Sequence, residues 1–251
     1  MMKQYMLMLL ALVAATTQAN ATPTEVVVRV ISQDAKFVGD SMGGAEVILR
    51  DAKSDKILAK GITSGGSGDT EKIMAAKGRS PARASDTAAS FRTTIDVQRP
   101  LLVRVEIKGP LGFPKIMQRA TSERWLVPGQ NAGDSDGWVV ELPGLAVRLL
   151  DPEPIAFIRG ETQILTAEVQ LMCGCPITPA GLWDSANYEV VAEVRQNGKL
   201  REVVTLPFSA APGRFAANWT PKTKGKADLT IIARNRITGN TGVLTEKIRV
   251  K

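Results

Sequence analysis

The stretch "LLVRVEIKG", residues 101–109, alternates between apolar and charged side chains. Every second residue from Val103 to Ile107 is apolar, and the residues between and after them, beginning with Arg104, are charged. Strict alternation over this length is the pattern of a β-strand that buries one face and exposes the other. The stretch therefore predicts a half-buried strand in a two-layered β structure.

The same alternation recurs on both sides of this stretch. Short runs rich in Val, Ile and Thr occur at 25–32, 44–51, 56–63, 90–96, 138–142, 162–172, 187–196, 200–207, 214–219, 227–235 and 242–250. Turns rich in Gly, Pro and Asn separate them, and no segment carries a clear amphipathic helical stripe. Many short strands at this spacing favour an all-β fold of two tandem antiparallel β-sandwich (Ig-like) domains.

The segment "LLDPEPIAFIRGE" (149–161) divides the chain into two parts. Its prolines cannot donate to a sheet ladder and stiffen the passage between modules. We therefore expect one sandwich at 22–150 and a second at 151–251. The first contains a polar, Gly/Ala/Ser-rich stretch at 64–89, and a loop of this length in a compact domain is either functional or mobile.

Two segments resemble known module families. The run "PGRFAANWTPKTKGKADLTIIARNRITGNTG" (212–242) resembles the closing hairpin of bacterial Ig-like and fibronectin-III-like modules. The stretch "GAEVILRDAKSDKILAKGIT" (44–63) looks like the strand-turn-strand unit of transthyretin-like or carboxypeptidase-regulatory-like modules. Both resemblances imply β-sandwich modules, and neither implies a chemistry.

The first 21 residues have the features of a cleaved signal peptide. Lys3 is followed by an uncharged apolar run from Met6 to Ala15, and Ala19-Asn20-Ala21 has the small-x-small pattern of a cleavage site. The apolar run is too short to span a bilayer, so we expect no transmembrane segment. The sequence predicts an exported protein, periplasmic or secreted, that is cleaved after Ala21.

Charge is distributed unevenly along the chain. Residues 195–251 contain 12 basic and 3 acidic residues, whereas residues 22–194 contain 19 basic and 22 acidic ones. A basic module in an exported protein favours an acidic partner protein, an anionic polymer or a membrane surface over nucleic acid. A solvated basic face without a partner is the simpler alternative.

The sequence contains no histidine. This excludes Ser-His-Asp and Cys-His catalytic groups, and metal sites that use imidazole ligands. Nucleophile elbows, phosphate-binding loops and zinc-protease helices are also absent from the sequence. We therefore expect a protein that is not an enzyme, with a role in binding another protein of the periplasm.

The only two cysteines lie in "LMCGCPITP" (171–179). In an extended strand the Cα atoms of Cys173 and Cys175 would be about 6.5–7 Å apart, at the edge of disulfide geometry, but a turn at Gly174 would close the gap. An oxidising compartment favours this disulfide. Core packing of two small side chains is a second interpretation.

Three functional interpretations of this segment remain open. As a contact surface it would act with the neighbouring residues Trp183 and Asp184 in an exported binding or accessory protein. With the thioether of Met172, the thiolates of Cys173 and Cys175 would make a soft ligand set for Cu(I), the one cofactor that the sequence suggests. A thiol–disulfide or sulfur-transfer protein is the third interpretation. The sequence does not indicate an oligomeric state.

Overall fold

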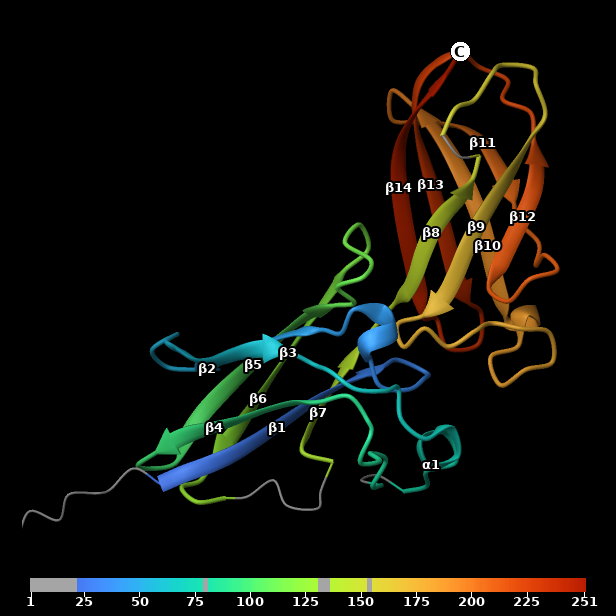
Figure 1. Ribbon diagram of the computed structural model, residues 1–251. Helices are drawn as coiled ribbons and strands as arrows, with labels where there is room; N and C mark the ends of the chain where they lie inside the picture. Colours follow the sequence, from blue (N-terminus) through green and yellow to red (C-terminus); the bar gives the residue numbers. More distant parts are fainter. Residues whose placement is uncertain (1–21, 79–80, 131–135, 153–154) are drawn as a thin grey trace, which may run out of the picture.

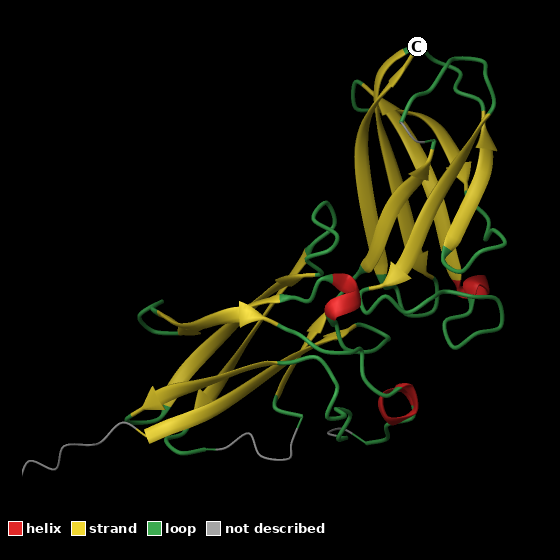
Figure 2. Ribbon diagram, in the orientation of Figure 1, coloured by secondary structure: helices red, strands yellow, loops and turns green. Residues whose placement is uncertain are grey.

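The computed structural model describes residues 22–78, 81–130, 136–152 and 155–251, which form two β-sandwiches joined end to end in a bent, elongated molecule (Figure 1). Each sandwich pairs a three-stranded sheet with a four-stranded sheet. Helical structure is limited to short turns (Figure 2). The all-β fold of two tandem sandwiches is confirmed. The predicted signal peptide, residues 1–21, lies outside the described residues.

The first sandwich packs the sheet β4-β1-β7 against the sheet β3-β2-β5-β6. Its strands are β1 (Thr22–Ser32), β2 (Glu46–Asp51), β3 (Ile57–Ile62), β4 (Phe91–Val97), β5 (Leu101–Gly109), β6 (Gln118–Leu126) and β7 (Trp138–Leu142). Strand β5 buries Val103, Val105 and Ile107, as its alternation predicts. The pairing of β1 with β7 is parallel, and the other pairings of this sandwich are antiparallel.

The second sandwich packs the sheet β12-β9-β8 against the sheet β11-β10-β13-β14. Its strands are β8 (Leu145–Asp151), β9 (Gln163–Leu171), β10 (Tyr188–Gln196), β11 (Lys199–Thr205), β12 (Arg214–Trp219), β13 (Gly225–Asn235) and β14 (Thr241–Val250). The short 3-10 turns are η1 (Asp40–Met42) and η2 (Ser185–Asn187). All pairings in this sandwich are antiparallel.

The change from one sandwich to the other comes earlier than the prolines at 152 and 154 indicate. Strand β8 pairs with β9, for example Val147 with Val169, and so belongs to the second sandwich. The boundary at residues 150–151 is therefore wrong by one strand. Only two residues, Pro143 and Gly144, separate β7 from β8, and the sequence there has no long linker to mark the change.

The long polar stretch 64–89 is folded against the first sandwich wherever it is described. It includes the short helix α1 (Thr70–Met74), whose first turn is capped by Asp69. The buried guanidinium of Arg29 donates hydrogen bonds to the backbone carbonyls of Ala88 and Ala89. Ile73 contributes to a small second core with Phe37. Local packing thus holds a segment that its composition did not predict to be structured.

Candidate functional site

The Cys-Gly-Cys segment forms a tight turn directly after β9. The amide of Gly174 donates a hydrogen bond to the carbonyl of Leu171 at 2.8 Å, and Gly174 has φ of 77°. This conformation brings the Cα atoms of Cys173 and Cys175 to 5.4 Å, and the two sulfurs form a disulfide bond. The turn that the sequence predicts at Gly174 is present, and it pairs the two cysteines.

The side chains of this disulfide turn, residues 172–175, are buried where the two sandwiches meet, and Gly174 is half-buried. Cys173 is 2% exposed, Cys175 4% and Met172 0%. The amide of Met172 donates to the hydroxyl of Ser32 in the first sandwich at 3.1 Å. A Cβ atom on Gly174 would lie 3.1 Å from the sulfur of Met42. The first sandwich covers these side chains, so residues 172–175 offer little surface to another molecule, whereas Leu182 later in the same loop is exposed and the predicted contact surface stays a prediction.

The copper hypothesis requires thiolates that this arrangement does not offer. The described residues contain no free cysteine, and they contain no group of three or more Cys, Asp or Glu side chains placed to hold a metal. The methyl end of Met172 packs over Gly144, where a Cβ atom would lie 2.9 Å from it. The three predicted ligands are therefore close in the chain but serve packing at the junction.

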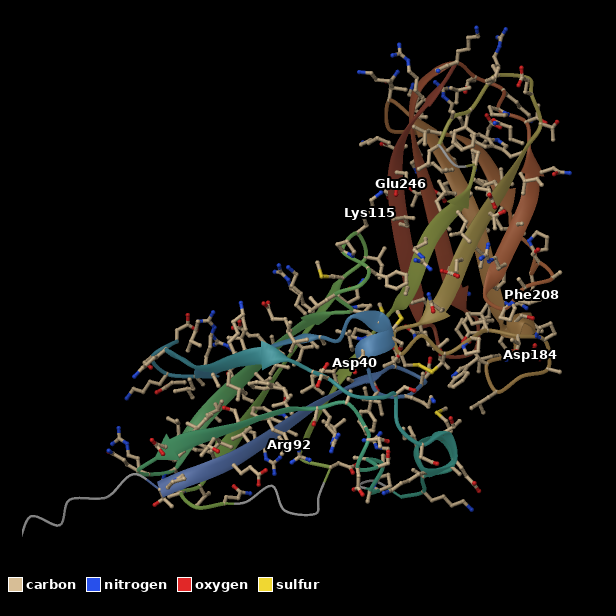
Figure 3. The ribbon with its side chains drawn as sticks, viewed as in Figure 1. Asp40, Arg92, Lys115, Asp184, Phe208 and Glu246 are labelled. Carbon is tan, nitrogen blue, oxygen red and sulfur yellow. A yellow bond between two sulfur atoms is a disulfide. The ribbon has the colours of Figure 1, made fainter. Side chains whose placement is uncertain are left out.

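The predicted interaction residues Trp183 and Asp184 also have internal partners. The indole of Trp183 donates a hydrogen bond to the carbonyl of Asp34 in the first sandwich at 2.9 Å. The carboxylate of Asp184, near the lower end of the second sandwich in Figure 3, caps the turn η2 by accepting from the amide of Ala186 at 3.0 Å. Trp183 thus contacts the first sandwich, and Asp184 stabilises the turn within its own loop.

Several polar residues of the junction were not predicted from the sequence. Asn240, 3% exposed, accepts a hydrogen bond from the amide of Gly144 at 2.7 Å and donates to the carbonyl of Gln33 at 3.4 Å. The hydroxyl of Thr238 donates to the carboxylate of Asp34 at 2.5 Å. In the sequence these residues look like ordinary turn residues. Only their contacts across the junction distinguish them.

A second contact closes the junction on the side of β14. The loop between β5 and β6 reaches the second sandwich, where Lys115 and Glu246 form an ion pair at 2.5 Å (Figure 3). The guanidinium of Arg148 lies 4.9 Å from the centre of the Phe113 ring. Buried apolar residues of both sandwiches belong to one continuous cluster. The junction is therefore a packed interface with directional polar contacts.

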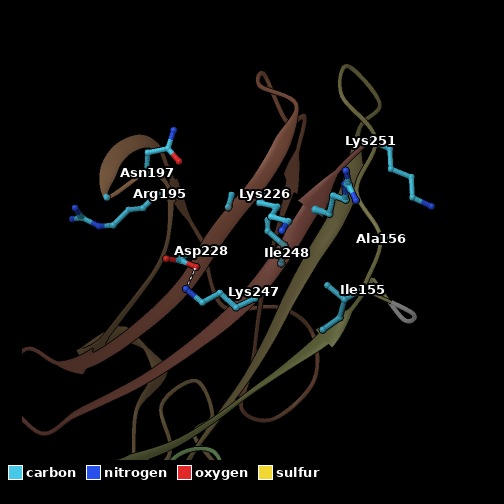
Figure 4. Close-up of a pocket in the computed structure, with 12 residues that line it drawn as sticks. Ile155, Ala156, Arg195, Asn197, Lys226, Asp228, Lys247, Ile248 and Lys251 are labelled. Atoms are coloured by element: carbon cyan, nitrogen blue, oxygen red, sulfur yellow. Dashed lines mark ion pairs between the residues drawn. The ribbon is translucent and has the colours of Figure 1, made fainter.

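The end of the second sandwich farthest from the junction carries an open pocket of about 770 Å³ (Figure 4). It is formed by the last residues of β10, the first residues of β13, the end of β14 and residues 155–156 beside β14. The cationic side chains that line it are Arg195, Lys226, Lys247, Arg249 and Lys251, and the one carboxylate is Asp228. Five of the basic residues that the sequence concentrates in 195–251 therefore line this basic pocket.

The cations of the basic pocket differ in their partners. Lys247 pairs with Asp228 at 2.6 Å, and Arg195 pairs with Glu193 at 2.8 Å. No ion pair joins Lys226, Arg249 or Lys251 to any carboxylate in the part of the chain that the structure describes. Three exposed positive charges thus remain available to an anion.

Two of these free cations face each other directly. Lys226 on β13 is the cross-strand partner of Arg249 on β14, and like charges in this position are destabilising. The first sandwich contains a comparable pair, Lys108 opposite Arg119, but there Glu46 lies opposite Lys108 on the other neighbouring strand. Glu46 makes its ion pair with Lys60 at 2.8 Å and acts on Lys108 only as a nearby charge. An anion in the basic pocket would supply such a charge to Lys226 and Arg249.

The strand pairing defines the chain as an all-β protein of two tandem β-sandwiches. No family model matches the chain, and a comparison with curated proteins finds no match. Among solved structures, the fibronectin(III)-like modules of CbhA from Clostridium thermocellum align at 14% identity with a TM-score of 0.30, over 83% of this chain and 78% of theirs.

Two further solved structures show similarly limited agreement. The chicken interferon gamma receptor alpha chain aligns at 10% identity with a TM-score of 0.32, over 91% of this chain and 98% of the receptor chain. An engineered protein aligns at 19% identity with a TM-score of 0.33, over 50% of this chain and 24% of its own. At these scores the alignments carry no argument about function.

Among the described residues, no helix has the length and apolar character needed to cross a bilayer.

Proposed function

We propose that this protein is an exported, non-enzymatic accessory protein that binds an acidic segment of a partner protein in its basic pocket. The observation that carries the proposal is the cross-strand pair of Lys226 and Arg249, which has no carboxylate partner in the described chain and lines a hollow of about 770 Å³. Oppositely charged partners are attracted to such a site, and the attraction weakens as salt is added.

The shape of the pocket favours a side chain or loop as its ligand over a membrane surface. A flat bilayer contacts protruding cations, whereas the charges here line a concave surface. Of the pocket residues, Ile155 is the one exposed large apolar side chain, at 44%. A single isoleucine offers little area for insertion into lipid. Carboxylates on a flexible acidic loop reach into the hollow and pair with both Lys226 and Arg249.

The junction supports this role because it fixes the basic pocket at a distance from the first sandwich. The hydrogen bond from Trp183 to Asp34 joins the two sandwiches at one end of the second sandwich, and the Lys115–Glu246 ion pair joins them near the middle of β14. The basic pocket lies at the other end. The first sandwich is then a spacer or second contact. The exported location in this proposal rests on the features of residues 1–21, and the non-enzymatic role on the absence of histidine.

Binding to a Glu-rich peptide by isothermal titration calorimetry tests the proposal. The variant Lys226→Gln/Arg249→Gln should bind at least tenfold more weakly than the parent protein, because two charge-assisted contacts are lost. The matched control is Lys108→Gln/Arg119→Gln, which removes the same charge from a cross-strand pair of the first sandwich. Equal weakening in both variants would show that net charge, and not the basic pocket, governs binding.

The location needs its own measurement. Amino-terminal sequencing of the protein recovered from the periplasm or medium of an expressing bacterium should begin at Thr22. Protein retained in the cytoplasm with residues 1–21 attached would contradict export while leaving the peptide-binding result unaffected.

A further inference from the structure

We propose that the Cys173–Cys175 disulfide is a redox latch for the junction: the two sandwiches stay docked while the bond is closed, and its reduction by a small dithiol opens them. This inference is independent of the ligand of the basic pocket. It starts from the position of the disulfide turn, which is buried between the sandwiches and contacts residues of both.

The disulfide turn has little free space around it. Met42, which lies against Gly174, is 2% exposed, and both cysteines are nearly as buried. The hydroxyl of Ser41 would lie 3.4 Å from a Cβ atom on Gly174. Met172, on the other side of Cys173, is wholly buried and packs on Gly144. Any side-chain displacement in the turn is therefore transmitted to residues of the first sandwich or to the segment that connects the sandwiches.

Reduction enlarges the group at the centre of this packing. Any disulfide holds its sulfurs at about 2.05 Å, whereas heavy atoms that are not bonded stay about 3.5–4.0 Å apart. Two thiols at Cys173 and Cys175 therefore need more room than the bond they replace. Overpacked interiors shift side chains and backbone instead of compressing. The adjacent hydrogen bond from Met172 to Ser32 is the first junction contact in the path of this shift.

The same displacement reaches the Trp183 contact through a short connection. Residues 176–183 follow the disulfide turn directly, with Pro176 bridged to Gln170 of β9. The amide of Thr178 donates to the carbonyl of Trp183 at 3.1 Å, so the ends of this loop move together. The indole of Trp183 donates a hydrogen bond to the backbone carbonyl of Asp34 in the first sandwich. Two of the contacts that dock the sandwiches, those of Met172 with Ser32 and of Trp183 with Asp34, thus depend on the small ring that the disulfide closes.

The chemistry is ordinary thiol–disulfide exchange. A thiolate of the dithiol attacks one cysteine sulfur, which forms a mixed disulfide and releases the other cysteine as a thiol. The second thiol of the reductant then displaces the first cysteine, so the protein gains two electrons and two protons while the dithiol becomes a cyclic disulfide. Because both sulfurs are buried in the docked form, the attack takes place during a transient opening of the junction, and the reduced turn then prevents the sandwiches from docking again. Docking and reduction therefore oppose each other.

Small-angle X-ray scattering of the mature chain with and without dithiothreitol tests the latch. The reduced protein should show a larger radius of gyration and two titratable thiols, with its far-ultraviolet circular dichroism unchanged. The Cys173→Ala/Cys175→Ala variant lacks both the bond and the crowding sulfurs, so it should keep the smaller radius. A reduced protein as compact as the oxidised one would overturn the latch, as would an Ala variant as expanded as the reduced protein.

The rate of reduction gives a second test that does not alter the cysteines. Trp183→Phe keeps an aromatic ring but loses the hydrogen bond to Asp34, which should raise the population of the open junction and the reduction rate about fivefold. Trp125→Phe, at an indole of the first sandwich that is 60% exposed, is the matched control and should leave the rate unchanged. Equal rates in Trp183→Phe and the parent protein would show that reduction does not pass through opening.

Discussion

The indole nitrogen of Trp183 lies 2.9 Å from the backbone carbonyl of Asp34, although the two residues are 149 positions apart in the chain. The carboxylate of the same Asp34 accepts a hydrogen bond from Thr238, on a different loop of the second sandwich. Two loops of one sandwich therefore hold a single turn of the other. Because hydrogen bonds are directional, this arrangement sets the orientation of the sandwiches as well as their contact.

Asn240 is expected to be the most sensitive polar residue of the junction. Asn240→Ala removes the acceptor of the buried Gly144 amide and should lower the free energy of unfolding by about 1–3 kcal/mol. Chemical denaturation followed by fluorescence measures this loss. Asn218→Ala, at an exposed position on β12, should change stability by less than about 0.5 kcal/mol. Similar losses at both positions would show that the junction bond contributes nothing particular.

Gly174→Ala separates backbone strain from crowding at the disulfide turn. Gly174 has φ of 77°, a conformation that costs a residue with a side chain about 1–2 kcal/mol. The new methyl group would also lie 3.1 Å from the sulfur of Met42. Gly239→Ala is a matched control, because Gly239 has the same φ and no atom within 4 Å of the added carbon. Thermal unfolding should show the larger loss for Gly174→Ala. Equal losses would mean that Met42 moves aside freely.

The position of the boundary predicts which fragment of the second sandwich folds. A fragment of residues 145–251 contains all strands of that sandwich and should unfold cooperatively. A fragment of residues 152–251 lacks β8. The edge of β9 that pairs with β8, which includes Val169, is then left without a neighbouring strand. Exposed edges of this kind aggregate. Gel filtration and thermal unfolding compare the two, and a stable monomer of 152–251 would contradict the assignment of β8.

Reversing one charge in the basic pocket should raise stability while it abolishes acid binding. Lys226→Glu places a carboxylate opposite Arg249 and should stabilise the protein by about 0.2–1 kcal/mol, most strongly at low salt. Lys108→Glu places a carboxylate opposite Arg119 but also opposite Glu46, so it should give no such gain. Denaturation midpoints at low and high salt measure the difference. A loss of stability in Lys226→Glu would show that Lys226 is not repelled by Arg249.

Local patterns in the sequence were sufficient for most of the strands and for the disulfide turn, but they did not predict β6 or β8. The alternation around Val105 identifies β5 because burial of one strand face follows the two-residue period of an extended chain. The freedom of Gly174 and the spacing of the cysteines predict a turn that brings the sulfurs together, since both depend on three adjacent residues. The excess of basic residues after 195 likewise predicts a basic module without locating its pocket.

Long-range pairing decided the rest. The sequence around β8 does not show that Val147 pairs with Val169, and the composition of the disulfide turn does not show that Met42 covers it. The basic pocket combines residues from four separate segments, so no local window contains it. The physical reason is that a strand pattern specifies which face is buried but not which neighbour buries it. The sequence by itself therefore determined the kind of fold and the chemistry available at each position. Only the tertiary structure decided that the cysteines lie in the junction and that the cations gather at the opposite end of the second sandwich.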